Sequence, residues 1–174
     1  QSYLEAANVS AGVRMVLHKN LPLAAGLGGG SSDAAAVLRA LSQLYPAEIN
    51  LSEIALKLGA DVPFFLGPGL AEGRGIGEKL TPLSPVKAHL VLLNPGIAVA
   101  AVTAYRNLRP EEWQPKLEVA QILEAIKSDQ ELPYWNTLEQ PVFRLEPRLK
   151  ELKLELQQAG LYGVLMSGSG STLF

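Results

Sequence analysis

The sequence predicts an α/β (α+β) fold, and three features of its pattern lead to this expectation. Short apolar segments of strand length alternate with longer segments in which apolar residues recur at helical spacing. A glycine-rich loop at 22–30 leads directly into the first long helical segment. Pro82 and Pro85 interrupt the pattern, so we expect one domain over 1–82 and a second over 83–174.

The first half is expected to hold two helices and a small amount of β-structure. Residues 13–17 (Val-Arg-Met-Val-Leu) predict a strand. Residues 32–45 predict a helix with one apolar face, and Pro46 closes it. A second helix is expected from Ser52 to a stop at Gly59. The glycines of 67–77 predict the bent edge of a hairpin.

The second half is expected to hold two strands and three helices. Residues 88–94 are the candidate for a membrane span, but about 18 apolar residues are needed to cross a bilayer, so this segment predicts one buried strand instead. Residues 161–166 predict another strand. The helices are expected at 102–108, at 117–126, and at 147–158, where Gly160 ends the last one.

Composition excludes several classes of protein. Hydrophobic residues make up 48% and charged residues 18%, which is typical of a packed domain. The net charge of −2 offers no broad basic surface for nucleic acid. The chain has no cysteine, which excludes disulfides and thiolate metal sites and suits a reducing compartment, the cytoplasm or a plastid stroma.

The strongest chemical signal is the segment 22–35, Pro-Leu-Ala-Ala-Gly-Leu-Gly-Gly-Gly-Ser-Ser-Asp-Ala-Ala. Its four glycines within 26–30 let the backbone curl and turn its amides inward. The loop enters a helix N-terminus, where several N–H groups lack partners, and this combination favours phosphate. Ser31 and Ser32 could cap the helix, donate to phosphate or bind a metal ion. A flexible loop followed by an N-cap is the alternative.

Two other phosphate-binding loops match this segment less well. A Walker A loop needs Gly-Lys-[Ser/Thr], and no lysine follows these glycines. The dinucleotide fingerprint Gly-x-Gly-x-x-Gly is nearly matched, but Ser31 replaces its last glycine and Pro22 lies where a strand should enter the turn. A fragment of a dinucleotide-binding oxidoreductase therefore remains an alternative.

Two further motifs could carry chemistry. Asp61, in Gly-Ala-Asp-Val-Pro-Phe, could accept the proton of a substrate hydroxyl, as the catalytic aspartate of other kinases does. Its alternative role is to cap a turn. Residues 167–172 read Ser-Gly-Ser-Gly-Ser-Thr after a predicted strand, which makes either a second amide-rich binding turn or a plain tight turn.

Taken in this order, the three motifs resemble those of the GHMP kinases. Mevalonate and homoserine kinases usually carry a shorter Gly-Leu-Gly-Ser-Ser loop. The triple glycine, Glu72-Gly-x-Gly-x-Gly-Glu78 and Asn136-Thr-Leu-Glu139 resemble the branch that acts on a cytidine diphosphate-linked methylerythritol in the non-mevalonate isoprenoid pathway. The resemblance covers about 19–174, nearly the whole chain.

The resemblance implies an ATP-dependent kinase with Mg²⁺ as its second cofactor. It would phosphorylate the 2-hydroxyl of its small-molecule substrate, with no nucleic-acid or membrane partner. The implied fold is a partial ribosomal-S5-like kinase domain followed by a ferredoxin-like domain. Asp61 would be the catalytic residue, and no residue is assigned to a metal. The loop and a lysine would bind ATP, namely Lys19, Pro22, Leu23, Ala24, Ala25, Gly26, Leu27, Gly28, Gly29, Gly30, Ser31 and Ser32. An aromatic side chain and the second turn would bind the substrate, namely Tyr105, Gly168, Ser169, Gly170, Ser171 and Thr172.

One departure from the family pattern limits these expectations. Family members begin with an extra strand pair that carries a lysine near the catalytic aspartate and residues that grip cytosine, and the sequence begins at Gln1 without it. We therefore expect the chain by itself to turn over poorly. Another GHMP small-molecule kinase, or a non-catalytic nucleotide-binding fragment, is the alternative.

Overall fold

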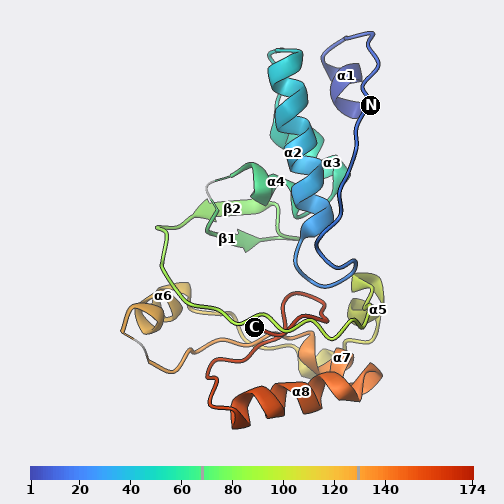
Figure 1. The fold of residues 1–174 in the computed structure, drawn as a ribbon. Helices are drawn as coiled ribbons and strands as arrows, with labels where there is room; N and C mark the ends of the chain where they lie inside the picture. Colours follow the sequence, from blue (N-terminus) through green and yellow to red (C-terminus); the bar gives the residue numbers. More distant parts are fainter. Residues whose placement is uncertain (68, 129) are drawn as a thin grey trace. The chain divides into compact units, whose positions relative to one another are not determined.

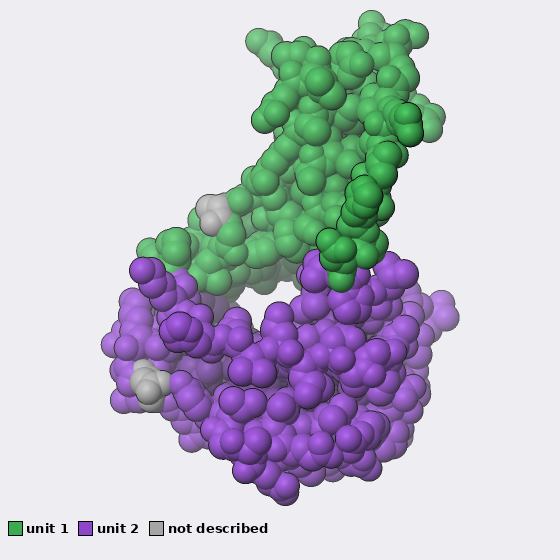
Figure 2. Space-filling view, in the orientation of Figure 1, with its two compact units in different colours: residues 1–20, 28–85 green, residues 21–27, 86–174 purple. Residues whose placement is uncertain are grey.

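A computed structural model describes residues 1–67, 69–128 and 130–174. The chain divides into two compact units, shown in Figure 2. Unit 1 contains residues 1–20 and 28–85, and unit 2 contains residues 21–27 and 86–174. Each unit has a hydrophobic core of its own. In the described ranges, none of the helices combines the length and the apolar character needed to cross a membrane.

The helices of unit 1 are α1 (Ser2–Ala6), α2 (Gly29–Leu44), α3 (Leu51–Leu58) and α4 (Val62–Leu66), as Figure 1 shows. The two predicted helices are confirmed as α2 and α3. Asn50 caps α3 because its side chain accepts a hydrogen bond from the backbone N–H of Ser52 at 3.0 Å.

The core of unit 1 lies between these helices. Tyr3 of α1 is 1% exposed, and its hydroxyl donates to the backbone carbonyl of Tyr45 at 2.6 Å, which ties α1 to the end of α2. Burying an aliphatic or aromatic side chain of this kind contributes about 1.5–3 kcal/mol. The buried set consists of Tyr3, Ala35, Leu38, Leu41, Ile54, Ala55 and Val62.

A two-stranded hairpin follows the helices of unit 1, as predicted. Strand β1 (Ala71–Arg74) pairs antiparallel with β2 (Lys79–Pro82). Glu78 fixes the turn, because its carboxylate accepts a hydrogen bond from the N–H of Ile76 at 2.7 Å. Hydrogen bonds from its own backbone N–H and from that of Ile76 lower the pKa of the Glu78 carboxyl. Pro68, within the predicted stretch, lies outside the described residues.

Unit 2 holds the remaining helices, also labelled in Figure 1. The predicted helices are confirmed as α5, α6 and α8, whereas α7 was not predicted. Proline usually argues against a helix, so Pro141 gave no reason to expect one at 139–145. In the structure this proline lies in the first turn of α7, where a helix tolerates it. The elements are α5 (Ala101–Arg106), the 3₁₀ turn η1 (Pro110–Glu112), α6 (Val119–Ser128), α7 (Glu139–Leu145) and α8 (Pro147–Gln158).

The strands predicted at 13–17, 88–94 and 161–166 are wrong for the structure described. Residues 13–17 have neither a strand nor a bridge, and the other two segments have only isolated bridges, which join Leu93 and Met166 to Leu173. The run expected to be buried is exposed, with 54–66% exposure across its residues 90–92. Apolar, β-branched composition indicates that a segment could be a strand, but a strand exists only where a partner completes a ladder of hydrogen bonds.

Candidate functional site

The second half of the glycine-rich loop forms the N-terminus of α2. Gly28 is the N-cap residue in a left-handed conformation (φ 64°), and no side chain caps the helix. The first-turn N–H groups therefore have no protein side chain as acceptor, which leaves them available to an anion. Ser32 does not cap the helix, because the helix begins at Gly29 rather than at Ser32 as predicted. Instead its hydroxyl donates to the carbonyl of Gly29 at 2.9 Å.

The space around two glycines of this loop differs: a side chain would clash at Gly28, whereas there is room for one at Gly30. A Cβ built on Gly28 would lie 2.6 Å from the ring of Phe65 in α4, so that ring fills the space of a side chain. A Cβ built on Gly30 would meet no heavy atom within 4 Å. The backbone around Gly30 is therefore open to close approach by a ligand.

Lys19, the predicted nucleotide-binding lysine, lies beside α2 in unit 1. Its ammonium is 2.5 Å from the carboxylate of Asp33, and the two side chains are 25% and 35% exposed. This ion pair balances the charge of Lys19 locally. The lysine therefore does not act as the unpaired cation that a Walker-type loop supplies.

Asp61 precedes α4 in the same unit and is exposed. Its side chain makes no capping hydrogen bond to α4, so the alternative role as a turn cap finds no support. A Cβ built on Gly77 would lie 3.7 Å from its Oδ1 atom, so a residue without a side chain stands beside the carboxylate. The helix that Asp61 precedes carries Phe65, the residue against Gly28. The Asp61 carboxylate is thus exposed and is not used to cap the helix.

The first half of the glycine-rich loop, residues 21–27, belongs to unit 2 and contacts the Ser/Gly turn at 167–172. Ser167 donates from its hydroxyl to the carbonyl of Gly26 at 2.8 Å. The N–H of Thr172 donates to the carbonyl of Ala25 at 3.2 Å, and Ala25 is 3% exposed. The glycine-rich loop and the Ser/Gly turn, which lie far apart in the sequence, therefore pack against each other in unit 2.

The Ser/Gly turn divides into an exposed part and a buried part. Gly168 is exposed and Ser169 is half-buried. Ser171 and Thr172 are fully buried: the hydroxyl of Ser171 donates to the carbonyl of Ile97, and that of Thr172 accepts from the Asn94 side chain at 2.9 Å. Both hydroxyls therefore stabilise the turn, and only its exposed part offers free surface.

Tyr105 lies on α5 and is 61% exposed. It lines a cavity of about 440 Å³ together with Trp113, Trp135 and Gly168. The chain contains two tryptophans, and both line this cavity. Aromatic walls of this kind suit a planar ring, because ring faces stack with favourable electrostatics. The cavity thus brings together the predicted aromatic residue and the predicted substrate turn within unit 2.

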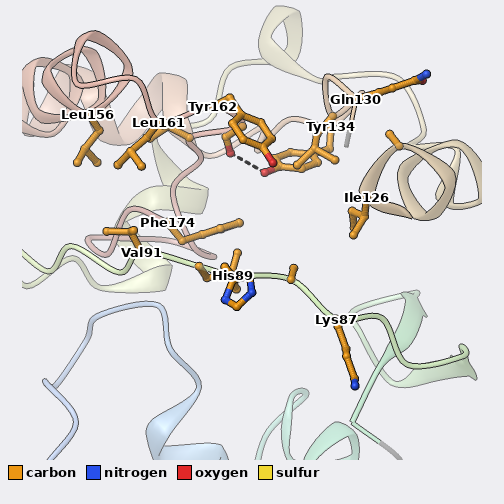
Figure 3. Close-up of a pocket in the computed structure, with 16 residues that line it drawn as sticks. Lys87, His89, Val91, Ile126, Gln130, Tyr134, Leu156, Leu161, Tyr162 and Phe174 are labelled. Carbon is orange, nitrogen blue, oxygen red and sulfur yellow. Dashed lines mark hydrogen bonds between the residues drawn. The ribbon is translucent and has the colours of Figure 1, made fainter. Parts of the chain in front are cut away.

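A second cavity of unit 2, of about 290 Å³, contains none of the predicted site residues (Figure 3). The exposed segment at 87–91 forms one wall, and Tyr134 and Phe174 stack with their ring centroids 6.4 Å apart within it. Burial, and to a smaller extent the charge of Glu139, raises the pKa of Tyr134. His89 also lines this cavity. In the described part of the chain, no three histidine, cysteine or acidic side chains gather into a group that could hold a metal ion.

Sequence reasoning named the Asn136-Thr-Leu-Glu139 motif without assigning it a role. In the structure, Asn136 and Glu139 bind the backbone at the start of the Ser/Gly turn. The acceptor of Asn136 also takes a hydrogen bond from the N–H of Leu138 at 2.9 Å, which is the local Asx-turn that such a motif favours. The Asx-turn depends on neighbouring residues, so the sequence motif is a signal for it. The contact with residues 166–168 joins distant parts of the chain, so no local pattern indicates it.

Comparisons with known proteins agree with this arrangement. Residues 1–69 match the family model described as the GHMP kinases N terminal domain, and residues 116–174 match the GHMP kinases C terminal model. The chain is 55% identical over 172 residues to the 4-diphosphocytidyl-2-C-methyl-D-erythritol kinase of Thermus thermophilus, covering 99% of this chain and 62% of the relative. The protein of the same name from Deinococcus radiodurans is 47% identical over 180 residues, covering 100% of this chain and 60% of the relative.

A solved structure is also similar. It is titled as the crystal structure of 4-(cytidine 5'-diphospho)-2C-methyl-D-erythritol kinase, and it matches with a TM-score of 0.86 and 53% identity. The match covers 98% of this chain and 64% of that chain. The chain therefore spans about three fifths of the length of the curated relatives it matches. Motifs, fold and relatives agree: the chain belongs to the GHMP kinase family.

Proposed function

We propose that the protein is an ATP-dependent kinase that phosphorylates the 2-hydroxyl of 4-(cytidine 5'-diphospho)-2-C-methyl-D-erythritol, a step of isoprenoid precursor synthesis. The names of the relatives that match 99–100% of this chain support the substrate. The observation that carries the reaction type is the free carboxylate of Asp61 in the same unit as the uncapped, glycine-rich start of α2.

The glycine-rich loop is the proposed site for the ATP phosphates. Its helix N-terminus has no capping side chain, and the space at Gly30 is open, so phosphate oxygens fit against backbone amides there. Bound ATP would supply the phosphoryl group, and Mg²⁺ would offset its charge, since Lys19 is already paired with Asp33. With no acidic cluster among the described residues, Mg²⁺ would be held mainly by phosphate oxygens and water, as is usual for this ion.

Asp61 is the proposed proton acceptor. Phosphoryl transfer needs an oriented hydroxyl whose proton leaves as the new P–O bond forms, and a nearby carboxylate can take that proton. No capping bond occupies the Asp61 side chain, so accepting the proton breaks no interaction that stabilises α4. The structural cost of using this residue in catalysis is therefore small.

The aromatic cavity of unit 2 is the proposed site for the cytidine end of the substrate. Tyr105 would stack on the base, and the exposed backbone of Gly168 and Ser169 would offer polar groups. Gly170, Ser171 and Thr172 would contribute by holding the turn, because all three are buried.

Ligand titration tests this proposal. ATP, cytidine diphosphate and NADH would each be titrated by calorimetry, and transfer of labelled γ-phosphate to the cytidine substrate would be measured in a chimera. In the chimera, this chain replaces the matching region of the Thermus thermophilus relative. We expect binding of ATP and cytidine diphosphate, with transfer in the chimera. Binding of NADH instead of ATP would indicate the oxidoreductase alternative, and binding without transfer would indicate a non-catalytic nucleotide-binding protein.

A further inference from the structure

The side chain of Asn136 holds the backbone of the Ser/Gly turn at two points. Its amide nitrogen donates to the carbonyls of Met166 and Gly168, each at 2.7 Å. Its amide oxygen accepts from the N–H of Leu138 at 2.9 Å. Both N–H donors of the amide and one lone pair of its oxygen are therefore used, which fixes the orientation of the side chain.

Glu139, the first residue of α7, holds the same segment from another side. Its Oε1 atom accepts from the N–H of Met166 at 2.9 Å, and its Oε2 atom accepts from the ammonium of Lys153 in α8 at 2.6 Å. The side chains of Glu139 and Lys153 are 12% and 19% exposed. The N–H and the carbonyl of Met166 are thus both bound by the Asn136–Glu139 motif, so this stretch of backbone is anchored to α7 and α8.

The anchored backbone is in turn the support of the glycine-rich loop. Ser167 lies between the two bound carbonyls, and its hydroxyl donates to the carbonyl of Gly26 at 2.8 Å. The N–H of Ser167 donates to the carbonyl of Thr172 at 2.8 Å, which closes the turn on itself. A Cβ built on Gly26 would lie 2.0 Å from the carbonyl oxygen of Ser167, so the two backbones are in van der Waals contact. Movement of 166–168 therefore moves Gly26.

We propose that Asn136 and Glu139 are positioning residues for the first half of the glycine-rich loop, acting through Met166, Ser167 and Gly26. The proposal rests on the function proposed above, in which this loop binds the phosphates of ATP. Residues 21–27 hold two alanines and a glycine, and a glycine leaves the backbone many conformations, so the loop needs support from outside. The anchored Ser/Gly turn supplies that support, and both residues act without touching nucleotide or substrate.

Amide hydrogen exchange tests the relay without any ligand. Asn136→Ala and Glu139→Ala should speed exchange in residues 166–170 and also at the amides of Val99 and Thr172, which donate to the loop carbonyls of Ala24 and Ala25. Ser167→Ala removes only the last link and should speed exchange at the amides of Val99 and Thr172 while the amide of Met166 stays protected. Tyr134→Phe is the matched control: its hydroxyl donates to the carbonyl of Gly163 at 2.5 Å, so it joins the same two segments outside the relay. This control should affect residues 161–165 alone.

Nucleotide affinity provides the second measurement, with ATP as the probe and circular dichroism to verify folding. Asn136→Ala should weaken ATP binding by roughly tenfold, the scale of a lost pair of hydrogen bonds, and Tyr134→Phe should leave it within about twofold. Unchanged exchange at Val99 and Thr172 in folded Asn136→Ala or Glu139→Ala would overturn the relay, as would equal acceleration by Tyr134→Phe. If the unaltered chain fails to bind ATP, the proposed function fails, and the exchange data still decide the relay.

Discussion

The carbonyl oxygen of Ser167 occupies the position that a side chain on Gly26 would need, since a Cβ built there would lie 2.0 Å from it. Gly26 also has a φ of +73°, which strains any other residue. Gly26→Ala should therefore lower the free energy of unfolding by at least about 2 kcal/mol, combining left-handed strain with overpacking.

Gly160→Ala is the matched control for that measurement. Its φ is +88°, but a Cβ built on Gly160 meets no heavy atom within 4 Å. Alanine at this position therefore has a strained left-handed backbone but no steric clash. Urea unfolding of both variants should show the larger loss for Gly26→Ala. Equal losses would mean that the contact with Ser167 does not constrain the loop.

Gly30→Val separates ligand binding from folding. The space around Gly30 is open, so the variant should unfold within about 1 kcal/mol of the unaltered chain, the range of helix propensities. The branched side chain should nevertheless obstruct the amides of the first turn and abolish measurable ATP binding. Gly12→Val is the control, because Gly12 has equally open surroundings away from the loop. Normal ATP affinity in Gly30→Val would remove this end of the loop from the site.

Asp61→Asn should lower kcat about 10²–10⁴-fold in the chimera with the Thermus thermophilus relative, because asparagine cannot accept the hydroxyl proton. ATP affinity and thermal stability should hardly change, since the carboxylate makes no capping bond. Glu48→Gln, another exposed acid of unit 1, should leave kcat unaltered. A kcat for Asp61→Asn near that of Glu48→Gln would exclude Asp61 as the base.

Tyr105→Ala should weaken binding of cytidine diphosphate by roughly 1–3 kcal/mol, the usual contribution of one base–aromatic stack. Tyr105→Phe keeps the ring and should bind almost normally. Because both tryptophans line the same cavity, tryptophan fluorescence reports on this site directly. ATP affinity should be unaffected. An equal loss for the two nucleotides would show that Tyr105 supports the fold instead.

The ion pair between Glu112 and Arg144 predicts a pH-dependent stability. A hydrogen bond from the Arg144 side chain, followed by one from the backbone of Arg109, lowers the pKa of the Glu112 carboxyl. The folded state therefore favours the charged form of Glu112. The ion pair stabilises the fold at pH values above the ordinary glutamate pKa of about 4.3. This stabilisation is lost as the pH falls through the lower pKa that Glu112 has in the folded protein.

The measurement compares Glu112→Gln with the unaltered chain by Tm. The variant should melt at a lower temperature at neutral pH, and the difference should shrink as the pH falls below about 4.3. Glu111→Gln, the neighbouring exposed acid, should melt like the unaltered chain throughout. A difference that grows with acidification would contradict the assigned direction of the pKa.

Much of the candidate site was visible in local pattern. The small-residue glycine loop followed by an apolar helical face predicted α2, which the structure confirms. A phosphate-binding role for its start, and a role as base for Asp61 after Gly59, are predictions from the same local pattern. Pro147 and Gly160 likewise bounded α8. The roles of the individual site residues stay predictions until the variants above are measured.

Local chemistry by itself determined five of the helices, α2, α3, α5, α6 and α8, and the hairpin turn, because backbone preference and apolar periodicity are properties of neighbouring residues. Only the tertiary structure decided that 88–92 is exposed, that Ser171 and Thr172 are buried, and that Ser167 bonds to Gly26 across 141 positions of sequence. The physical reason is that burial and hydrogen-bond partners are set by segments far apart in the chain, and no spacing within one segment records which distant segment will pack against it.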